Sequence, residues 1–105
     1  MSSQAVSPRE KEVLERVTEI LKRHLSPTKI ILFGSRAKGK NHRGSDFDFA
    51  IDRHKPSARQ ERTIFEEIEQ AVGLYDVDIV YLREVDLPFR KLIQKTGKVI
   101  YERRS

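Results

Sequence analysis

The sequence predicts a small α/β domain in which helices flank a small mixed β-sheet. Segments with a helical spacing of apolar residues alternate with short strand-like segments along the chain, which is typical of a sheet covered by helices. The connection between the first two predicted strands, residues 34–44, is short and has no room for a full helix. We therefore expect these two strands to be antiparallel and the sheet to be mixed.

The first predicted helix begins at Pro8. Ser7 can cap it, proline suits the first helical position, and Glu10 completes a capping box. Apolar residues then recur at helical spacing as far as Leu25, where a Ser-Pro pair ends the helix. The run Lys-Ile-Ile-Leu-Phe at residues 29–33 predicts a buried strand.

The second strand is predicted over residues 46–52, where Asp-Phe-Asp-Phe-Ala-Ile-Asp alternates strictly and gives the strand two unlike faces. Ser57 and Gln60 offer a second capping box, which opens a helix with an apolar stripe. Gly73 lies where a C-terminal helix glycine belongs. The third strand should cover residues 77–82.

The last part of the chain predicts a short helix over residues 87–95 and an edge strand at residues 99–101. The apolar residues of this helix, Phe89, Leu92 and Ile93, should face inward.

Length and composition limit the classes of protein to consider. A chain of 105 residues can close one hydrophobic core, so we expect a single domain over residues 1–105. The absence of cysteine excludes disulfides and thiolate-bound metals. No apolar run approaches the roughly 20 residues of a membrane helix, and the start of the chain does not resemble a signal peptide, so we expect a cytoplasmic protein without a membrane partner. The net charge of +5 favours anionic partners such as nucleotides.

Two carboxylates in the second predicted strand suggest a metal site. Asp46 and Asp48 are two residues apart, so both should project from one face of the sheet. Two carboxylates held side by side repel each other and resist joint ionisation, so they either stay in water or bind a cation between them. Hard oxygen ligands favour Mg²⁺, with Mn²⁺ as an alternative. Asp52 shares the face and could shape the cleft without binding metal.

The third predicted strand can supply another carboxylate. Asp76 and Asp78 share a face there, and Asp78 lies in mid-strand among apolar residues, where an unpaired charge would be costly. If this strand neighbours the second one, Asp78 completes a three-carboxylate cluster with Asp46 and Asp48. Such a cluster can hold two metal ions roughly 4 Å apart, which stabilise the attacking and leaving oxygens of a displacement at phosphorus. A basic partner is the alternative explanation for Asp78.

The turn after the first strand suggests a phosphate site. Gly34 permits close approach of a ligand to the backbone, and free amide groups with the Ser35 hydroxyl can hold phosphate oxygens. Arg36, Lys38 and Arg43 could add charge to the same triphosphate, although they could equally be solvated loop residues. The stretch is not a Walker A loop, because it lacks the Gly-Lys-Ser/Thr ending.

Gly34-Ser35, ten further residues and then Asp46-Phe47-Asp48 resemble the signature of the DNA polymerase β-type nucleotidyltransferase superfamily. The surrounding residues are similar to its minimal nucleotidyltransferase branch, which includes the antitoxins of two-gene modules whose other member is a helical HEPN-domain protein. The resemblance covers nearly the whole chain. That fold also runs from a strand through a Gly-Ser turn and an Asp-x-Asp strand to a helix and a strand with a third Asp.

The resemblance implies a role for each matching residue. Gly34 and Ser35 would hold the β- and γ-phosphates of ATP. Asp46 and Asp48 would bind both metals, and Asp78 would bind the catalytic metal and help to activate an incoming hydroxyl. The hydroxyl would attack the α-phosphate and pyrophosphate would leave. In the antitoxin branch the acceptor is implied to be a tyrosine of the HEPN partner, which is adenylylated and so silenced.

Two other functions stay open at this point. The domain could neutralise a toxic partner by occluding it, with nucleotide as a structural ligand at most. Direct binding of nucleic acid is suggested by the charge of +5. No aromatic-rich stacking surface supports that third hypothesis, so we do not expect a nucleic-acid partner.

Overall fold

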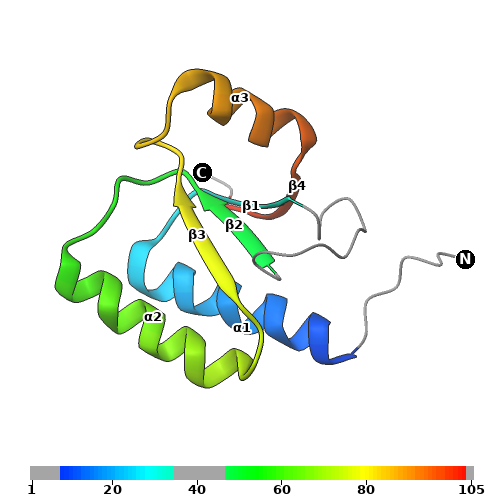
Figure 1. The fold of residues 1–105 in the computed structure, drawn as a ribbon, viewed down its shortest axis with the longest axis vertical. Helices are drawn as coiled ribbons and strands as arrows, with labels where there is room; N and C mark the ends of the chain where they lie inside the picture. Colours follow the sequence, from blue (N-terminus) through cyan, green and yellow to red (C-terminus); the bar gives the residue numbers. More distant parts are fainter. Residues whose placement is uncertain (1–7, 35–46, 104–105) are drawn as a thin grey trace, which may run out of the picture.

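The computed structural model describes residues 8–34 and 47–103, which form three helices and four strands (Figure 1). In chain order these are α1 (Pro8–Leu25), β1 (Lys29–Phe33), β2 (Phe47–Ile51), α2 (Ala58–Val72), β3 (Val77–Tyr81), α3 (Leu87–Thr96) and β4 (Lys98–Glu102). The predicted order of helices and strands is confirmed. Over the ranges described, none of the helices combines the length and apolar character needed to cross a membrane.

The four strands form one mixed sheet in the order β3-β2-β1-β4. β1 is antiparallel to both of its neighbours, β2 and β4. β2 and β3 are parallel, because α2 connects them and returns the chain to the same end of the sheet. The mixed sheet that the short connection after β1 predicts is therefore confirmed.

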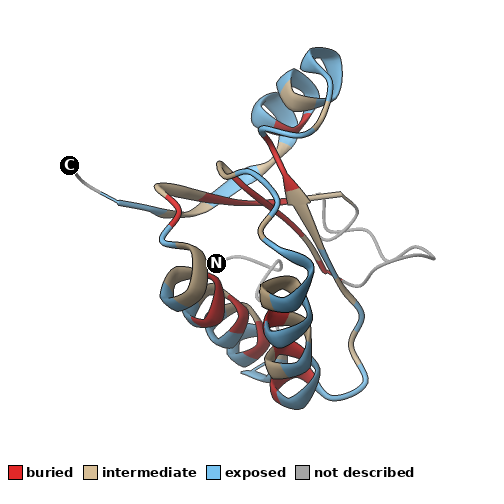
Figure 2. Cartoon of the chain, turned by 90° about the vertical axis from the view of Figure 1, so that its left-hand side faces the viewer, coloured by how far each residue is buried: buried red, intermediate tan, exposed pale blue. Residues whose placement is uncertain are grey.

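The two faces of the sheet are covered unequally, as Figures 1 and 2 show. α1 and α2 lie side by side against one face, whereas α3 lies alone over the other face. The larger core lies between the sheet and the α1–α2 pair, and it includes the fully buried rings of Phe47 and Phe49. A smaller cluster packs α3 onto the sheet and consists of Ile31, Ala50, Leu82 and Ile93.

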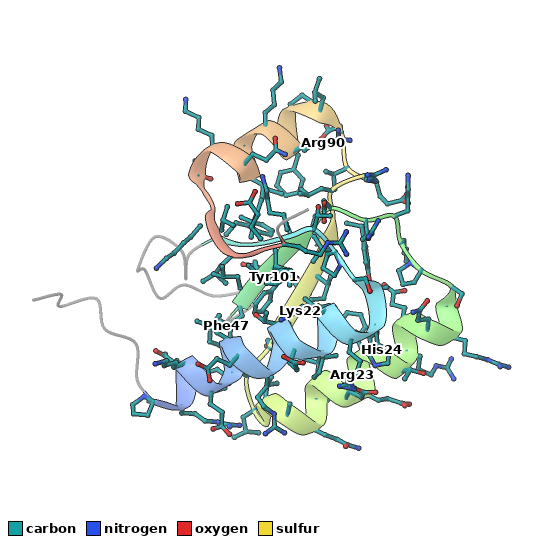
Figure 3. All side chains as sticks on the ribbon, turned by 180° about the vertical axis from the view of Figure 1, so that it is seen from behind. Lys22, Arg23, His24, Phe47, Arg90 and Tyr101 are labelled. Atoms are coloured by element: carbon teal, nitrogen blue, oxygen red, sulfur yellow. The ribbon has the colours of Figure 1, made fainter. Side chains whose placement is uncertain are left out.

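Contacts at the helix ends hold the α1–α2 layer together. The Ser57 side chain caps α2 by accepting a hydrogen bond from the Gln60 backbone N–H at 3.1 Å, and Gly73 ends the helix with φ 68°. The Gln60 side-chain amide donates to the carbonyl oxygen of His24 at 3.0 Å, so it links α2 to the end of α1. His24 also lies on the α2 side of α1, with Nε2 2.9 Å from Glu67 Oε2 (Figure 3).

The prediction that three apolar residues of α3 face inward is confirmed for Ile93 and wrong for Leu92, while Phe89 contacts Phe33 of the sheet but stays partly exposed. Ile93 is only 1% exposed, whereas Phe89 is 38% and Leu92 is 55% exposed. Within the described ranges no second helix lies beside α3 on its face of the sheet. The residues on the flanks of α3 therefore stay in contact with solvent, and only the side chain directly over the sheet is buried.

Candidate active site

Asp48 of β2 and Asp78 of β3 are direct neighbours across the parallel strand pair. Residues paired in this way project from the same face of a sheet, and for these two it is the face that carries α3, opposite the buried rings of Phe47 and Phe49. Asp48 is half-buried and Asp78 is exposed. The condition for the predicted cluster, that the second and third strands are neighbours, is thus met, and the pair forms a row of two carboxylates.

Gly34, directly after β1, brings its backbone against the carboxylate of Asp48. Its φ of 80° lies in the region that favours glycine. A Cβ atom at this position would collide with Asp48 Oδ2 and lie 3.3 Å from Asp48 Cγ. The approach follows from the register, because Phe33, the residue before Gly34, pairs with Asp48 across β1 and β2. Both the backbone conformation and the close contact therefore require glycine.

Five other predicted site residues, Ser35, Arg36, Lys38, Arg43 and Asp46, lie outside the described residues. Asp46 directly precedes the first residue of β2. Within residues 8–34 and 47–103, no three or more His, Cys, Asp or Glu side chains form a group that could hold a metal ion. A three-carboxylate cluster at this end of the sheet would therefore need Asp46, and its role stays a prediction.

Two further aspartates near these strands have structural contacts. The backbone oxygen of Asp76 accepts a hydrogen bond from Phe47 N at 3.0 Å, which joins the starts of β2 and β3. Asp52 Oδ1 accepts from the backbone N–H groups of Thr28 and Lys29 at 3.0 and 3.1 Å, and Oδ2 accepts from the Thr28 hydroxyl. Asp52 thus stabilises the start of β1, at the end of β2 opposite to Asp48. The hypothesis that it shapes the cleft is not supported.

Two groups with shifted pKa values lie at the far end of β3 from Asp78. Burial raises the pKa of Tyr81 to about 12, and the nearby charge of Glu61 and a hydrogen bond to it act in the same direction. Tyr81 is the last residue of β3, and Glu84 follows shortly after it. Hydrogen bonds from His54 and from the Lys55 backbone lower the pKa of Glu84. These shifts belong to the packing of that end of the sheet.

An aromatic contact connects α3 to the carboxylate row. The rings of Phe33 and Phe89 meet edge to face with their centroids 6.1 Å apart. Because Phe33 pairs with Asp48, Phe89 lies one side chain away from that acid. The sequence analysis missed this contact. The only signal for it was the apolar residue at position 89, which the helical pattern assigned to the core.

Comparisons with known proteins show the family and the fold of this chain. The family model described as polymerase beta nucleotidyltransferase matches residues 15–105. A protein of Methanocaldococcus jannaschii, provisionally named protein adenylyltransferase MJ1379, is 31% identical over 84 residues, which are 77% of this chain and 83% of that protein.

Solved structures share the fold. A chain in the crystal structure of a toxin-antitoxin with AMP-PNP superposes with a TM-score of 0.70 at 24% identity, over 86% of this chain and 73% of that one. A mutant of the toxin-antitoxin MntA-HpeT gives a TM-score of 0.70 at 22% identity with the same coverage. In that mutant, two aspartates separated by one residue are replaced by glutamate.

The family match extends over most of the chain and includes every described strand and most of α1. The archaeal relative covers more than two thirds of the chain at 31% identity. This chain is therefore a nucleotidyltransferase and belongs to the polymerase β nucleotidyltransferase family.

Proposed function

We propose that this chain transfers AMP from ATP to a hydroxyl group of a partner protein in a reaction that depends on divalent metal ions. The observation that carries the proposal is the row of Asp48 and Asp78 on neighbouring strands, with the Gly34 backbone against the first of these acids. Paired carboxylates suit a triphosphate with bound cations, because they supply the hard oxygen ligands that Mg²⁺ prefers.

Asp48 and Asp78, with Asp46, would hold two Mg²⁺ ions, and Mn²⁺ could replace them. The two observed acids fit this role because they share one face and lie at one end of the sheet. Bound there, the metals would neutralise the charge that develops on the phosphate oxygens. Gly34 and Ser35 would hold the β- and γ-phosphates.

The remaining predicted residues, Arg36, Lys38 and Arg43, would add positive charge around the triphosphate. In the reaction, the acceptor oxygen forms a bond to the α-phosphorus, and the bond from that phosphorus to the oxygen bridging to the β-phosphate breaks. Pyrophosphate leaves, and the proton of the acceptor hydroxyl is lost with the help of Asp78. The product is a phosphodiester between AMP and the partner protein.

We further propose that the acceptor is a tyrosine of a helical HEPN-type protein encoded nearby, and that the modification silences this partner as an antitoxin does. Three comparisons support this proposal. The archaeal relative is named for protein adenylylation. Both solved structures are toxin-antitoxin structures, one with an ATP analogue and one altered at an Asp-x-Asp pair.

The test incubates the chain and the purified HEPN-type partner with Mg²⁺ and ATP labelled at the α-phosphate. We expect covalent label on the partner, and none when the label is on the γ-phosphate. Asp48→Asn and Asp78→Asn should abolish labelling while the circular dichroism spectrum is retained. Glu66→Gln is the control, because Glu66 is an exposed acid of α2, which covers the opposite face of the sheet.

Full labelling by both the Asp48→Asn and the Asp78→Asn variants would refute the proposed site. A stoichiometric complex of chain and partner without covalent label would instead favour neutralisation by occlusion.

A further inference from the structure

The two flanks of α3 face different parts of the sheet. Arg90 donates from Nε to the backbone oxygen of Leu82 at 2.9 Å, so its flank faces the segment after β3 (Figure 3). Phe89 contacts Phe33, which pairs with Asp48. Leu92 follows Phe89 by three residues and so lies on the same side of the helix. We call Phe89 and Leu92 the inner flank, because Phe89 contacts the ring beside Asp48 and Leu92 shares its side of the helix.

The inner flank is apolar and exposed. Phe89 is 38% and Leu92 55% exposed, and Phe89 lies beside the residue that pairs with Asp48. Two exposed apolar side chains on one side of a helix offer a partner protein a contact that removes apolar area from water. Their position beside the acids means that whatever covers them is within reach of the reacting phosphate.

The surroundings of the inner flank are basic. Residues 91–98 contain three basic side chains and no acidic one. Lys91, Lys95 and Lys98 are all exposed. A partner surface that fits here would combine an apolar side chain with a surplus of carboxylates.

We propose that the inner flank is the docking surface for the acceptor protein, which presents an acidic segment with an apolar side chain close to the accepting hydroxyl. This inference rests on the proposed function, because it places the acceptor of that reaction. The aliphatic side chain of Leu92 favours a protein over nucleic acid, since stacking of bases would call for further aromatic rings. The apolar contact holds the partner protein beside the acid row, while the lysines attract the acidic segment.

The experiment measures binding of the purified HEPN-type partner to the Asp48→Asn chain, which allows affinity to be determined without turnover. Leu92→Gln should raise the dissociation constant about tenfold, which corresponds to ~1.4 kcal/mol. Leu87→Gln is the matched control, because Leu87 is 53% exposed on the same helix and lies about 140° away from Leu92 around the helix axis. We expect the control to change affinity less than twofold.

Kinetics of the active chain give a second readout. Leu92→Gln should raise the KM for the partner about tenfold and leave both kcat and the KM for ATP unchanged. Lys95→Gln should weaken partner binding at low salt and reduce its dependence on ionic strength. Together these results would separate a docking role from a general loss of folded protein.

Several outcomes would overturn the docking proposal. Equal effects of Leu92→Gln and Leu87→Gln, or no effect of either, would exclude the inner flank as the partner surface. A raised KM for ATP with an unchanged KM for the partner would assign the flank to the nucleotide base. Weaker binding of a single-stranded oligonucleotide by Leu92→Gln, with partner binding intact, would assign it to nucleic acid.

Failure of the proposed function gives a different result. A parent chain that binds the partner but never labels it would refute nucleotidyl transfer, and the Leu92→Gln comparison would still decide the docking surface. A parent chain that labels the partner with the same KM as Leu92→Gln would support the function and refute the surface. Absence of any measurable partner binding by the Asp48→Asn chain would also refute the surface.

Discussion

Gly34→Ala should separate the stability of the fold from the geometry of the acid row. The φ of Gly34 is 80°, and a left-handed conformation costs an alanine about 1–2 kcal/mol. The new Cβ would collide with Asp48 Oδ2, which is the far end of a flexible side chain and can move aside. We therefore expect a loss of unfolding free energy close to the conformational cost alone.

The expected effect on transfer is larger. To reach ordinary van der Waals contact, Oδ2 of Asp48 must move by about 1 Å. A displacement of that size at a reacting group can lower a rate about a hundredfold. Urea unfolding would measure the stability, and the transfer of α-phosphate label to the partner would measure the rate per folded molecule.

Gly73→Ala is the control for this experiment. Gly73 has a similar φ of 68°, but a Cβ there would meet only the guanidinium of Arg9, at 3.3 Å. It should lose at least as much stability, because its ψ of −119° lies outside the left-handed helical region, and it should keep its rate of transfer. Equal rates in the two variants would refute the argument that the Gly34 backbone holds the Asp48 carboxylate in place.

Three further variants test other parts of the structure. The pKa of Tyr81 is raised to about 12 from the usual 10.0, so the unfolded chain loses the phenol proton at lower pH than the folded chain, and the free energy of unfolding should fall as pH rises from 10 to 12. Tyr81→Phe should remove the step at highest pH from an ultraviolet titration of the tyrosines. An unchanged titration would contradict the assignment of the raised pKa to Tyr81. Asp52→Ala should lower the unfolding free energy by about 1–3 kcal/mol, because the amides of Thr28 and Lys29 lose their acceptor. The rate of nucleotidyl transfer per folded molecule should be retained. A loss of transfer would place Asp52 in the active site. Ile93→Ala should cost about 2–5 kcal/mol in urea unfolding, because Ile93 is the buried residue of α3; a cost below 1 kcal/mol would mean that α3 is not anchored through it.

The sequence predicts a mixed sheet whose first two strands are antiparallel, because the lengths of the connections decide strand direction. The short segment after Phe33 requires an antiparallel neighbour for β1, and the helix after β2 allows β3 to return in parallel. Alternation then assigns Asp48 and Asp78 to the face opposite the buried aromatic rings. These predictions depend on chain connectivity and on the alternation of side chains between the two faces of a strand.

Other features depend on how elements meet in space. Alternation groups Asp52 with Asp48, but four residues of strand separate them by about 13 Å, so only Asp48 lies beside Gly34. The sequence pattern of α3 would look the same if a second helix packed beside it or if its flanks stayed in solvent. Exposure of Leu92 therefore could not be predicted, nor could the contact of Phe89 with Phe33.

The place of β3 in the sheet affects what size of acceptor can be modified. β3 is an outermost strand, so Asp78 stands at the rim of the sheet instead of at its centre. A residue at a rim can be reached sideways by a bulky, already folded molecule, which need not thread an extended peptide into a deep channel. Access from the side suits an enzyme that acts on folded proteins, because the target protein need not unfold before its residue is modified.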